Sequence, residues 1–271
     1  MGTRYPYFSF LTDYGLEDGF VAACHGVVAR LAPHARILDI THLVPPGDVR
    51  RGAAVLAQTV PYLPAGVHVA VVDPGVGTQR RAVAIEAGES VFIGPDNGVL
   101  SWVVQGAGGA RRVHELTNPE LRLHPVSRTF HGRDIFVPAA ASIAAGLDIA
   151  ETGAGFPPAE LATLPMQQGR LNAGWAEGEV LSVDHFGNVQ LSVTHDQLEQ
   201  LGARLGGALV VEMGRRRLTV PLSETFASVP PDKLVAFTDS AGYVAVAVNS
   251  GNAAERLGLP PGAHVRLKPA P

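Results

Sequence analysis

Apolar and polar positions in the first half of the chain alternate between strand-like and helix-like patterns. Short apolar runs predict strands at 8–11, 36–40, 67–72, 82–86 and 90–93. Between the strands, apolar residues recur at helical spacing over 18–31 and 49–60, and a helix of small residues is expected at 134–146. Strands that alternate with helices predict an α/β domain with a central, mostly parallel sheet.

The pattern changes near residue 155. Proline and glycine are frequent over 155–174, where periodicity is weak, as is typical of a linker. Beyond it, short alternating runs separated by turn residues indicate a small all-β barrel or sandwich. These runs are 179–183, 189–193, 208–212, 217–221, 234–238, 244–249 and 263–268. We therefore expect an N-terminal α/β domain at 1–160, a linker at 161–172 and a smaller C-terminal β-barrel domain at 173–271.

Composition narrows the class of protein. A chain of 271 residues that is 46% hydrophobic can bury the cores of two domains. A formal net charge of −4 predicts no basic surface for nucleic acid. The N-terminus lacks the apolar run of a signal peptide, and no stretch approaches the roughly 18 apolar residues of a membrane span. We expect a cytoplasmic protein without nucleic-acid or membrane partners.

The scarcity of lysine and cysteine excludes several kinds of site. All but two of the 21 cationic residues are arginine, and neither Lys233 nor Lys268 follows a glycine-rich loop, which excludes a Walker-A nucleotide site. Both are poor candidates for a Schiff-base lysine. A single cysteine, Cys24, excludes an internal disulfide framework and any cysteine-based zinc cluster.

Carboxylates follow two of the predicted strands, where ligand crevices open in α/β sheets. Asp13 lies in Thr12-Asp13-Tyr14-Gly15 and has the chemistry to accept both hydroxyls of a ribose, although an Asx-turn or a helix cap explains it equally. Asp73 opens Asp73-Pro74-Gly75-Val76-Gly77 and is followed by Arg80 and Arg81. This second segment lacks the third glycine of a dinucleotide fingerprint, so a tight turn with surface arginines is the simple alternative.

Two further segments carry candidate chemistry. His131 lies beside Gly132 just before a predicted helix, a placement suited to acid–base work next to an accessible backbone amide. A purely structural histidine is the alternative. Asp184-His185-Phe186-Gly187-Asn188, in the second domain, offers a carboxylate, an aromatic surface and a carboxamide, but also has the composition of a hairpin turn.

The order of the motifs, taken together, resembles one family. The motifs run from Leu11-Thr12-Asp13-Tyr14-Gly15 through Val72-Asp73-Pro74-Gly75-Val76-Gly77-Thr78-Gln79-Arg80-Arg81, Gly94-Pro95-Asp96-Asn97-Gly98, Phe130-His131-Gly132-Arg133-Asp134 and Asp184-His185-Phe186-Gly187-Asn188 to Asn249-Ser250-Gly251-Asn252-Ala253-Ala254. The chain is similar over nearly its whole length to the adenosine-forming S-adenosyl-L-methionine hydrolases, also called SAM hydroxide adenosyltransferases. These are relatives of the fluorinating and chlorinating enzymes.

The resemblance implies a fold, an assembly and a catalytic set. It implies an N-terminal α/β domain, a C-terminal β-barrel and a homotrimer, with active sites between one subunit's first domain and its neighbour's second. It assigns catalysis to Asp73, Arg80 and His131, without a cofactor or a metal ion. The halogenating relatives place tyrosine at position 73 and lack the histidine at 131, so this chain resembles the hydrolytic members at both positions.

The resemblance also implies the substrate contacts. Asp13 would bind the ribose hydroxyls, and the Gly132 amide lies beside the catalytic histidine. In the second domain, Asp184 and Asn188 would hold the amino-acid end of the substrate, with Phe186 beside them. Ser240 would meet the carboxylate, and the backbone at Ala253 the adenine edge. Two positions depart from the pattern: Gly47 stands where the halogenating relatives have tryptophan, and Ser250 stands where many members have arginine.

The chemistry of Asp73, Arg80 and His131 agrees with this catalytic assignment, but two other functions remain open. Water attacking the ribose C5′ displaces neutral methionine from a sulfonium, so the nucleophile, rather than the leaving group, needs activation. Asp73 and His131 are both candidates to take its proton, and Arg80 is the expected bidentate partner of Asp73. The rivals are a metal-dependent hydrolase that uses Asp13, Asp73, His131 and Asp184 as ligands, and a non-catalytic binding protein for S-adenosyl-L-methionine or adenosine. Halogenation is disfavoured because Asp73 would repel a halide.

Overall fold

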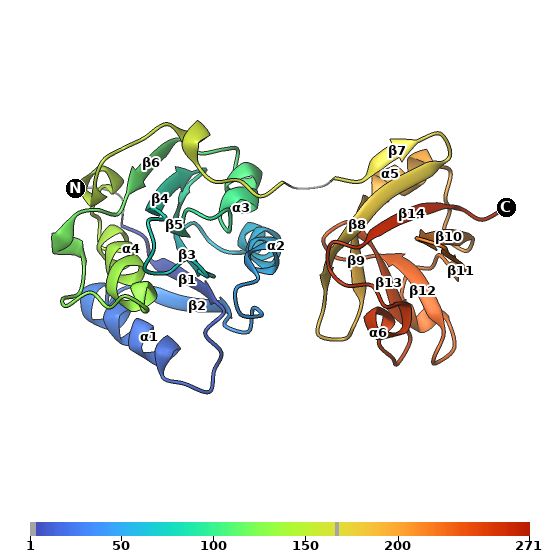
Figure 1. Cartoon of the computed structure of the whole chain (residues 1–271), viewed down its shortest axis with the longest axis horizontal. Coiled ribbons are helices and arrows are strands. Elements are labelled where there is room, and N and C mark those ends of the chain that lie inside the picture. The colour runs from blue at the N-terminus through green and yellow to red at the C-terminus, as the bar shows by residue number, and fades with distance from the viewer. Residues whose placement is uncertain (1–3, 166–167) are drawn as a thin grey trace. The chain divides into compact units, whose positions relative to one another are not determined.

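The computed structural model describes residues 4–165 and 168–271. The chain divides into two compact units, Met1–Pro165 and Met166–Pro271 (Figure 1). Residues 1–3 of the first predicted domain, and residues 166 and 167 of the predicted linker, lie outside the described residues. Within the first unit, the backbone of Leu164 accepts a hydrogen bond from the Trp102 indole, so the chain is still attached to this unit there.

A six-stranded sheet forms the centre of the first unit. Its strands are β1 (Tyr7–Thr12), β2 (Arg36–Thr41), β3 (Val67–Val71), β4 (Ala82–Ala87), β5 (Ser90–Pro95) and β6 (Arg112–Glu115). In space they follow the order β2-β1-β3-β5-β4-β6. Strands β2, β1, β3 and β5 run parallel to one another. Strand β4 is antiparallel to both of its neighbours, β5 and β6, and a tight turn at Gly88 joins it to β5.

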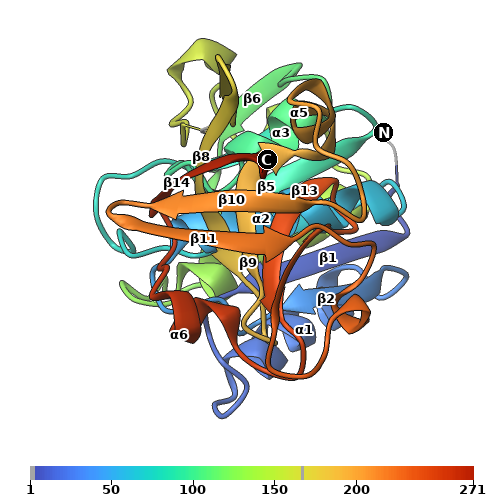
Figure 2. The same cartoon turned by 90° about the vertical axis from the view of Figure 1, so that its right-hand side faces the viewer.

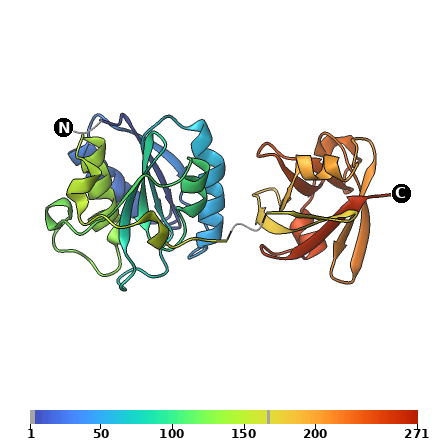
Figure 3. The same ribbon diagram turned by 90° about the horizontal axis from the view of Figure 1, so that it is seen from above.

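Helices cover both faces of this sheet (Figure 3). Helix α1 (Phe20–Leu31) packs with α4 (Val137–Ala144) on one face, and α2 (Val49–Thr59) packs with α3 (Ser101–Gly106) on the other. Asp48 caps α2 by accepting a hydrogen bond from the Arg51 amide at 2.9 Å. Gly52 lets α2 approach the sheet, since a Cβ there would lie 2.9 Å from Val72 Cγ2.

The predicted helix at 134–146 begins differently from the expectation. A π-helical turn, η3 (Gly132–Phe136), precedes α4. Pro138 has no N–H to donate to the Asp134 carbonyl, which instead accepts from the Leu123 amide at 2.9 Å. The regular helix therefore starts only at Val137. Short 3-10 turns lie at Val60–Tyr62, Pro119–Leu121, Ile149–Thr152, Pro158–Glu160 and Phe226–Ser228.

The second unit is a nearly closed antiparallel barrel. Its strands are β7 (Arg170–Asn172), β8 (Trp175–Val183), β9 (Val189–Thr194), β10 (Ala208–Met213), β11 (Arg216–Pro221), β12 (Leu234–Thr238), β13 (Tyr243–Val248) and β14 (His264–Pro269). Their order is β11-β10-β14-β8-β9-β13-β12, with β7 paired to β8, and Figure 2 shows the β10–β11 hairpin in front. A bridge between Leu222 and Ala236 links the region after β11 to β12, so the two edges of the sheet meet.

Two short helices complete this unit, α5 (His195–Gln200) and α6 (Ala253–Leu257). The inward-facing residues of β8, β9, β10 and β13 form one apolar core with the buried side of α6. The predicted fold class, a mostly parallel α/β domain followed by a smaller all-β barrel, is confirmed. Strand β7 lies inside the segment predicted as linker. Among the described residues, none of the helices is both long and apolar enough to cross a membrane.

His68 is the polar exception in the fully buried strand β3. Its Nδ1 lies 2.8 Å from Ser9 Oγ on β1, its Nε2 lies 3.2 Å from Ser90 Oγ on β5, and its ring stacks on Phe92. Burial lowers the pKa of His68 to about 4. The native state therefore holds this ring neutral across a pH range in which an unfolded histidine is already protonated.

We predict that His68 makes the protein less stable as the pH falls from 7 to 5. In the unfolded chain His68 takes up a proton near pH 6.5, whereas in the native state it does so only near pH 4. At pH 5 this difference lowers the free energy of unfolding by about 2 kcal/mol. Urea unfolding at both pH values measures the loss. His68→Gln, which cannot titrate, should show a smaller difference between the two pH values. Equal differences in the two proteins would refute the assignment.

Candidate active site

Two predicted carboxylates lie at the same edge of the first sheet. Asp13 directly follows β1, and Asp73 follows β3 after Val72. Because β1 and β3 are adjacent and parallel, both carboxylates are at the carboxyl ends of their strands. This is the edge at which α/β proteins open their ligand crevices.

The Asp13 carboxylate is held by a neighbouring loop. Its Oδ2 accepts a hydrogen bond from the Gly47 amide at 2.8 Å. Gly47 has a φ of +73°, in the left-handed region, and a Cβ there would touch the Cβ of Pro74 at 3.7 Å. The glycine thus brings the loop that orients Asp13 against the loop that carries Asp73.

Asp73 forms a bidentate ion pair with Arg80, as the sequence predicts. The Arg80 Nε lies 3.0 Å from each carboxylate oxygen, and Nη2 lies 2.5 Å from Oδ2. Both side chains are nearly buried, at 11% exposed for the arginine and 5% for the aspartate.

Arg80 also contacts the third predicted catalytic residue. Its Nη2 lies 2.8 Å from His131 Nδ1, and its guanidinium lies over the Phe136 ring, 5.1 Å from the centroid. A guanidinium only donates, so His131 Nδ1 accepts and the ring proton lies on Nε2. The contact between Asp73 and His131 therefore runs through Arg80, which differs from the direct carboxylate–imidazole pair of a serine-type triad.

The loops that carry the three residues fit closely together. Gly77, with a φ of +76°, passes so near the Arg128 carbonyl that a Cβ would lie 2.5 Å from its oxygen. Position 77 lies between Asp73 and Arg80, and Arg128 lies just before His131. The close approach thus joins the loop of the ion pair to the loop of the histidine.

The electrostatic environment of His131 favours its neutral form. Burial, followed by the positive charge of Arg80, lowers the pKa of the imidazole, and Asp73 opposes this effect to a smaller extent. Protonation would place an Nδ1–H against the guanidinium. His131 is therefore neutral at pH 7, with its Nε2–H as a hydrogen-bond donor.

Tyr14 belongs to this site, although the sequence analysis assigned it no role. Its ring packs edge-on against Phe130, with centroids 5.6 Å apart, and its hydroxyl reaches Gly132, where a Cβ would collide with it. Burial raises the pKa of the Tyr14 phenol well above its ordinary value, and the charges of Asp13 and Asp73 raise it further. Its position next to Asp13 in the same motif was the available signal.

Arg81, the neighbour of Arg80, has a different environment. Its Nε lies 2.8 Å from Asp96 Oδ2, and its Nη2 donates to the Glu160 carbonyl. Asp96 Oδ1 in turn accepts from the Ala162 amide at 2.8 Å. Arg81 therefore fastens the segment around residue 160 to the first unit and takes no part in the Asp73–Arg80–His131 contacts.

Four of the candidates in the second unit lie close together. Asp184 Oδ1 accepts from the Phe186 and Asn188 amides at 2.9 Å each, and Oδ2 accepts from Asn188 Nδ2 at 2.7 Å. Phe186, at the tip of this turn, is 74% exposed. The Gly187 carbonyl accepts from the amide after Ala253 at 3.0 Å, which joins the turn to the start of α6.

Ser240 lies in a different turn of the second unit. It lies in the exposed turn between β12 and β13, where the Gly242 carbonyl accepts from the His195 amide at 3.0 Å. His195 follows the end of β9, whereas Asn188 precedes its start. A side-chain contact links the turn of Ser240 to the start of β9, because Gln190 Nε2 donates to Asp239 Oδ2 at 2.6 Å and Gln190 Oε1 accepts from Ser182 Oγ at 3.1 Å. The role of Ser240 at the substrate carboxylate stays a prediction.

The alternative of a metal site at Asp13, Asp73, His131 and Asp184 does not fit the contacts in the first unit. The Asp73 oxygens and His131 Nδ1 are already bound to Arg80. A second cation beside this fixed guanidinium would be repelled at short range. The arrangement instead suits a fixed positive charge that orients a carboxylate and a neutral imidazole.

Comparison with known proteins gives a consistent family. Residues 8–153 match the SAM hydroxide adenosyltransferase N-terminal domain, and residues 178–266 match the corresponding C-terminal domain. The chain is 54% identical to the (R)-S-adenosyl-L-methionine hydrolase of Salinispora tropica, over 97% of each chain. It is 45% identical to the protein of that name from Thermus thermophilus, over 95% of this chain and 98% of the relative.

A solved structure and a second group of relatives extend the comparison. An uncharacterized conserved protein from Thermotoga maritima matches with a TM-score of 0.91 and 34% identity, over 96% of this chain and 99% of that one. A fluorinase from Nocardia brasiliensis is 29% identical, over 98% of this chain and 97% of the relative.

We predict that Arg80 keeps the pKa of His131 low. ¹⁵N NMR of the imidazole should show a pKa below the ordinary value of about 6.5 and a proton on Nε2 in the neutral ring. Arg80→Met removes the nearby positive charge and should raise this pKa. Arg128→Met, which removes an exposed guanidinium from the loop of His131, should leave it unchanged. A proton on Nδ1 would contradict the proposed contact with Arg80.

We also predict that Gly132 tolerates no side chain. In Gly132→Ala, the Cβ collides with the Tyr14 hydroxyl, and overpacking should lower the free energy of unfolding by about 1–3 kcal/mol. Gly26→Ala, on the exposed side of α1 with open space around it, should be neutral or stabilising by up to about 1 kcal/mol. Urea unfolding measures both values, and equal stabilities of the two variants would argue against the Tyr14–Gly132 contact.

Proposed function

The chain belongs to the SAM hydroxide adenosyltransferase family, and from that premise we propose that it hydrolyses S-adenosyl-L-methionine to adenosine and L-methionine. The names of the hydrolase relatives specify the R configuration, so we propose the (R)-sulfonium epimer as the preferred substrate. The observation that carries the proposal is the chain of contacts from Asp73 through Arg80 to His131 beside Asp13.

The reaction needs an activated nucleophile and a substrate held in line with it. A water oxygen forms a bond to the ribose C5′ while the C5′–S bond breaks. The electron pair of the broken bond stays on sulfur, so that methionine leaves as a neutral thioether. The water proton passes to the protein and then to solvent. Because a sulfonium leaves without acid assistance, activation and positioning of the water supply the rate enhancement, at about 10²–10⁴-fold for proton transfer.

The contacts divide the proposed roles among the three residues. Asp73 accepts the proton of the water, since it is the only one of the three that faces the site as an anion. His131, neutral with its proton on Nε2, donates a hydrogen bond that holds the water oxygen. Arg80 touches both groups and fixes their geometry, and its charge favours hydroxide character in the water. Approach of hydroxide to a sulfonium neutralises charge, which a pocket closed to bulk water favours.

Substrate binding uses both units in this proposal. Asp13, oriented by Gly47, binds the ribose hydroxyls, and the Gly132 amide adjoins His131. Asp184, Asn188, Phe186 and the backbone at Ala253 hold the methionine and adenine ends. We propose that they come from a neighbouring subunit of a homotrimer. The three hydrogen bonds within the Asp184 turn support this role because they fix the carboxylate in one orientation.

We predict that adenosine and methionine form from the (R)-epimer of S-adenosyl-L-methionine, as measured by chromatography of the reaction mixture. Arg80→Lys should reduce kcat by about 10²-fold or more, because an ammonium cannot form the bidentate pair while contacting His131. Arg81→Lys is the matched control and should retain activity, since the contacts of Arg81 are with Asp96, the Phe156 ring and the segment at Glu160 rather than with Asp73 or His131. With H₂¹⁸O, the label should appear on the adenosine 5′-hydroxyl.

Several outcomes would overturn parts of this proposal. Unchanged substrate with folded protein would leave a binding protein, and turnover that persists in Asp73→Ala would remove the catalytic assignment. Label at any other position would refute attack at C5′. Formation of a 5′-halogenated adenosine in chloride or fluoride would indicate the chemistry of the relatives named fluorinase.

A further inference from the structure

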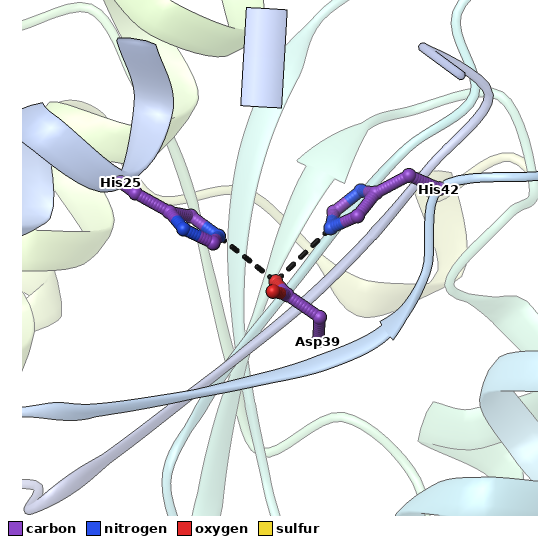
Figure 4. Close-up of side chains that lie close together, drawn as sticks. All are labelled: His25, Asp39 and His42. Atoms are coloured by element: carbon purple, nitrogen blue, oxygen red, sulfur yellow. Dashed lines mark hydrogen bonds and ion pairs between the residues drawn. The ribbon is translucent and has the colours of Figure 1, made fainter. Parts of the chain in front are cut away.

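A second group of ligating side chains lies on the first unit, apart from the Asp73–Arg80–His131 contacts. His25 comes from α1, Asp39 from β2 and His42 from the turn that follows β2. Both histidine Nε2 atoms point at the same carboxylate oxygen (Figure 4). Asp39 Oδ1 lies 2.9 Å from His25 Nε2 and 3.0 Å from His42 Nε2, and the three ligand atoms lie within 4.8 Å of one another.

The burial of the three groups differs in a way that suits a metal site. The His42 side chain is 3% exposed, whereas His25 and Asp39 are 33% and 40% exposed. Within the described part of the chain, His42 Nε2 is a buried nitrogen without a hydrogen-bond partner, even though it points at Asp39 Oδ1. A buried polar atom left in this state costs stability unless a further group satisfies it.

The other ring nitrogen of His42 explains why Nε2 is available. His42 Nδ1 lies 2.9 Å from Thr12 Oγ1, which also accepts from the Tyr14 amide at 3.2 Å. When Nδ1–H donates to this oxygen, the lone pair of Nε2 faces the Asp39 carboxylate, and two electron-rich atoms then meet at 3.0 Å. A cation between them removes this repulsion. Metal-bound histidines commonly have such a second partner on the distal nitrogen.

We propose that His25, Asp39 and His42 bind a divalent transition-metal ion of the zinc type. Two imidazole nitrogens and one carboxylate oxygen form a common protein ligand set for zinc, with ligand bonds of about 2.0–2.2 Å and water in the fourth position. The partial exposure of His25 and Asp39 gives the ion a route from solvent and leaves space for that water. The sequence did not point to this site, because the three ligands come from separate elements without a recognisable spacing.

The site would act on the position of the Asp13 loop rather than on the reaction itself. Strand β2 is an edge strand of the sheet, and a bound ion would tie it to α1 and, through His42 and Thr12, to the end of β1. Thr12 directly precedes Asp13 and Tyr14. This assignment does not depend on the proposed hydrolysis, because it concerns ion binding and stability only.

The test uses the full chain, purified without a metal-affinity tag, stripped with a chelator and titrated with Zn²⁺ alone. We expect one equivalent to bind, and the Tm to rise by roughly 5–10 °C at a free zinc concentration about a hundredfold above Kd. His25→Ala and Asp39→Asn should each weaken binding by about 100-fold or more and abolish the Tm shift. His195→Ala is the matched control, since His195 and Glu199 form an exposed pair at 3.4 Å and no third ligand joins them among the residues that the structure describes.

A measurement on the wild-type protein covers the case in which a variant fails to fold. Co²⁺ in place of Zn²⁺ should give the visible absorption bands of a four-coordinate ion with imidazole ligands, and added Zn²⁺ should remove them. Absence of zinc binding by the stripped wild type, or equal binding by wild type and both ligand variants, would overturn the proposal. Loss of binding in His195→Ala alone would do the same.

Discussion

The position of one guanidinium controls the geometry of the site. Arg80 contacts both oxygens of the Asp73 carboxylate and Nδ1 of His131, and it lies over the Phe136 ring. Without it, the carboxylate would lose its bidentate partner and the imidazole would lose the donor at Nδ1. Removing one partner of a nearly buried ion pair typically costs about 3–5 kcal/mol, because the remaining charge has no compensation. The Asp73–Arg80 ion pair therefore both orients the site residues and stabilises the loops that carry them.

The sequence predicted the elements whose residues have a strong local pattern. The run at 67–72 is apolar except for His68 and forms the central strand β3, and Gly88 marks the turn between β4 and β5. Short elements such as α3, β6 and α6 were not predicted, since they are held by contacts rather than by their own periodicity. The late start of α4 follows from Pro138, whose missing N–H leaves the Asp134 carbonyl to accept from the Leu123 amide of the preceding segment.

For the site, residue types could be read from the sequence, whereas contacts between distant residues could not. The pair of Asp73 and Arg80 lies within one loop, and its bidentate contact was expected and is present. The approach of Tyr14 to Gly132 joins segments more than one hundred residues apart, and the convergence of His25, Asp39 and His42 joins three elements. The turn of Ser240 is a further example, because its link to β9 runs through a side-chain contact between Gln190 and Asp239.

The close passage of Gly77 beside the Arg128 carbonyl has a consequence for how such a site can change over time. The first loop carries Asp73 and Arg80, and the second leads to His131, so neither can lengthen, shorten or acquire a bulkier residue at the crossing point without displacing the other. Insertions here would have to be matched in both segments at once. A designer who grafts the Asp73–Arg80–His131 arrangement onto another scaffold would therefore need to transfer the two loops as a single interlocked piece.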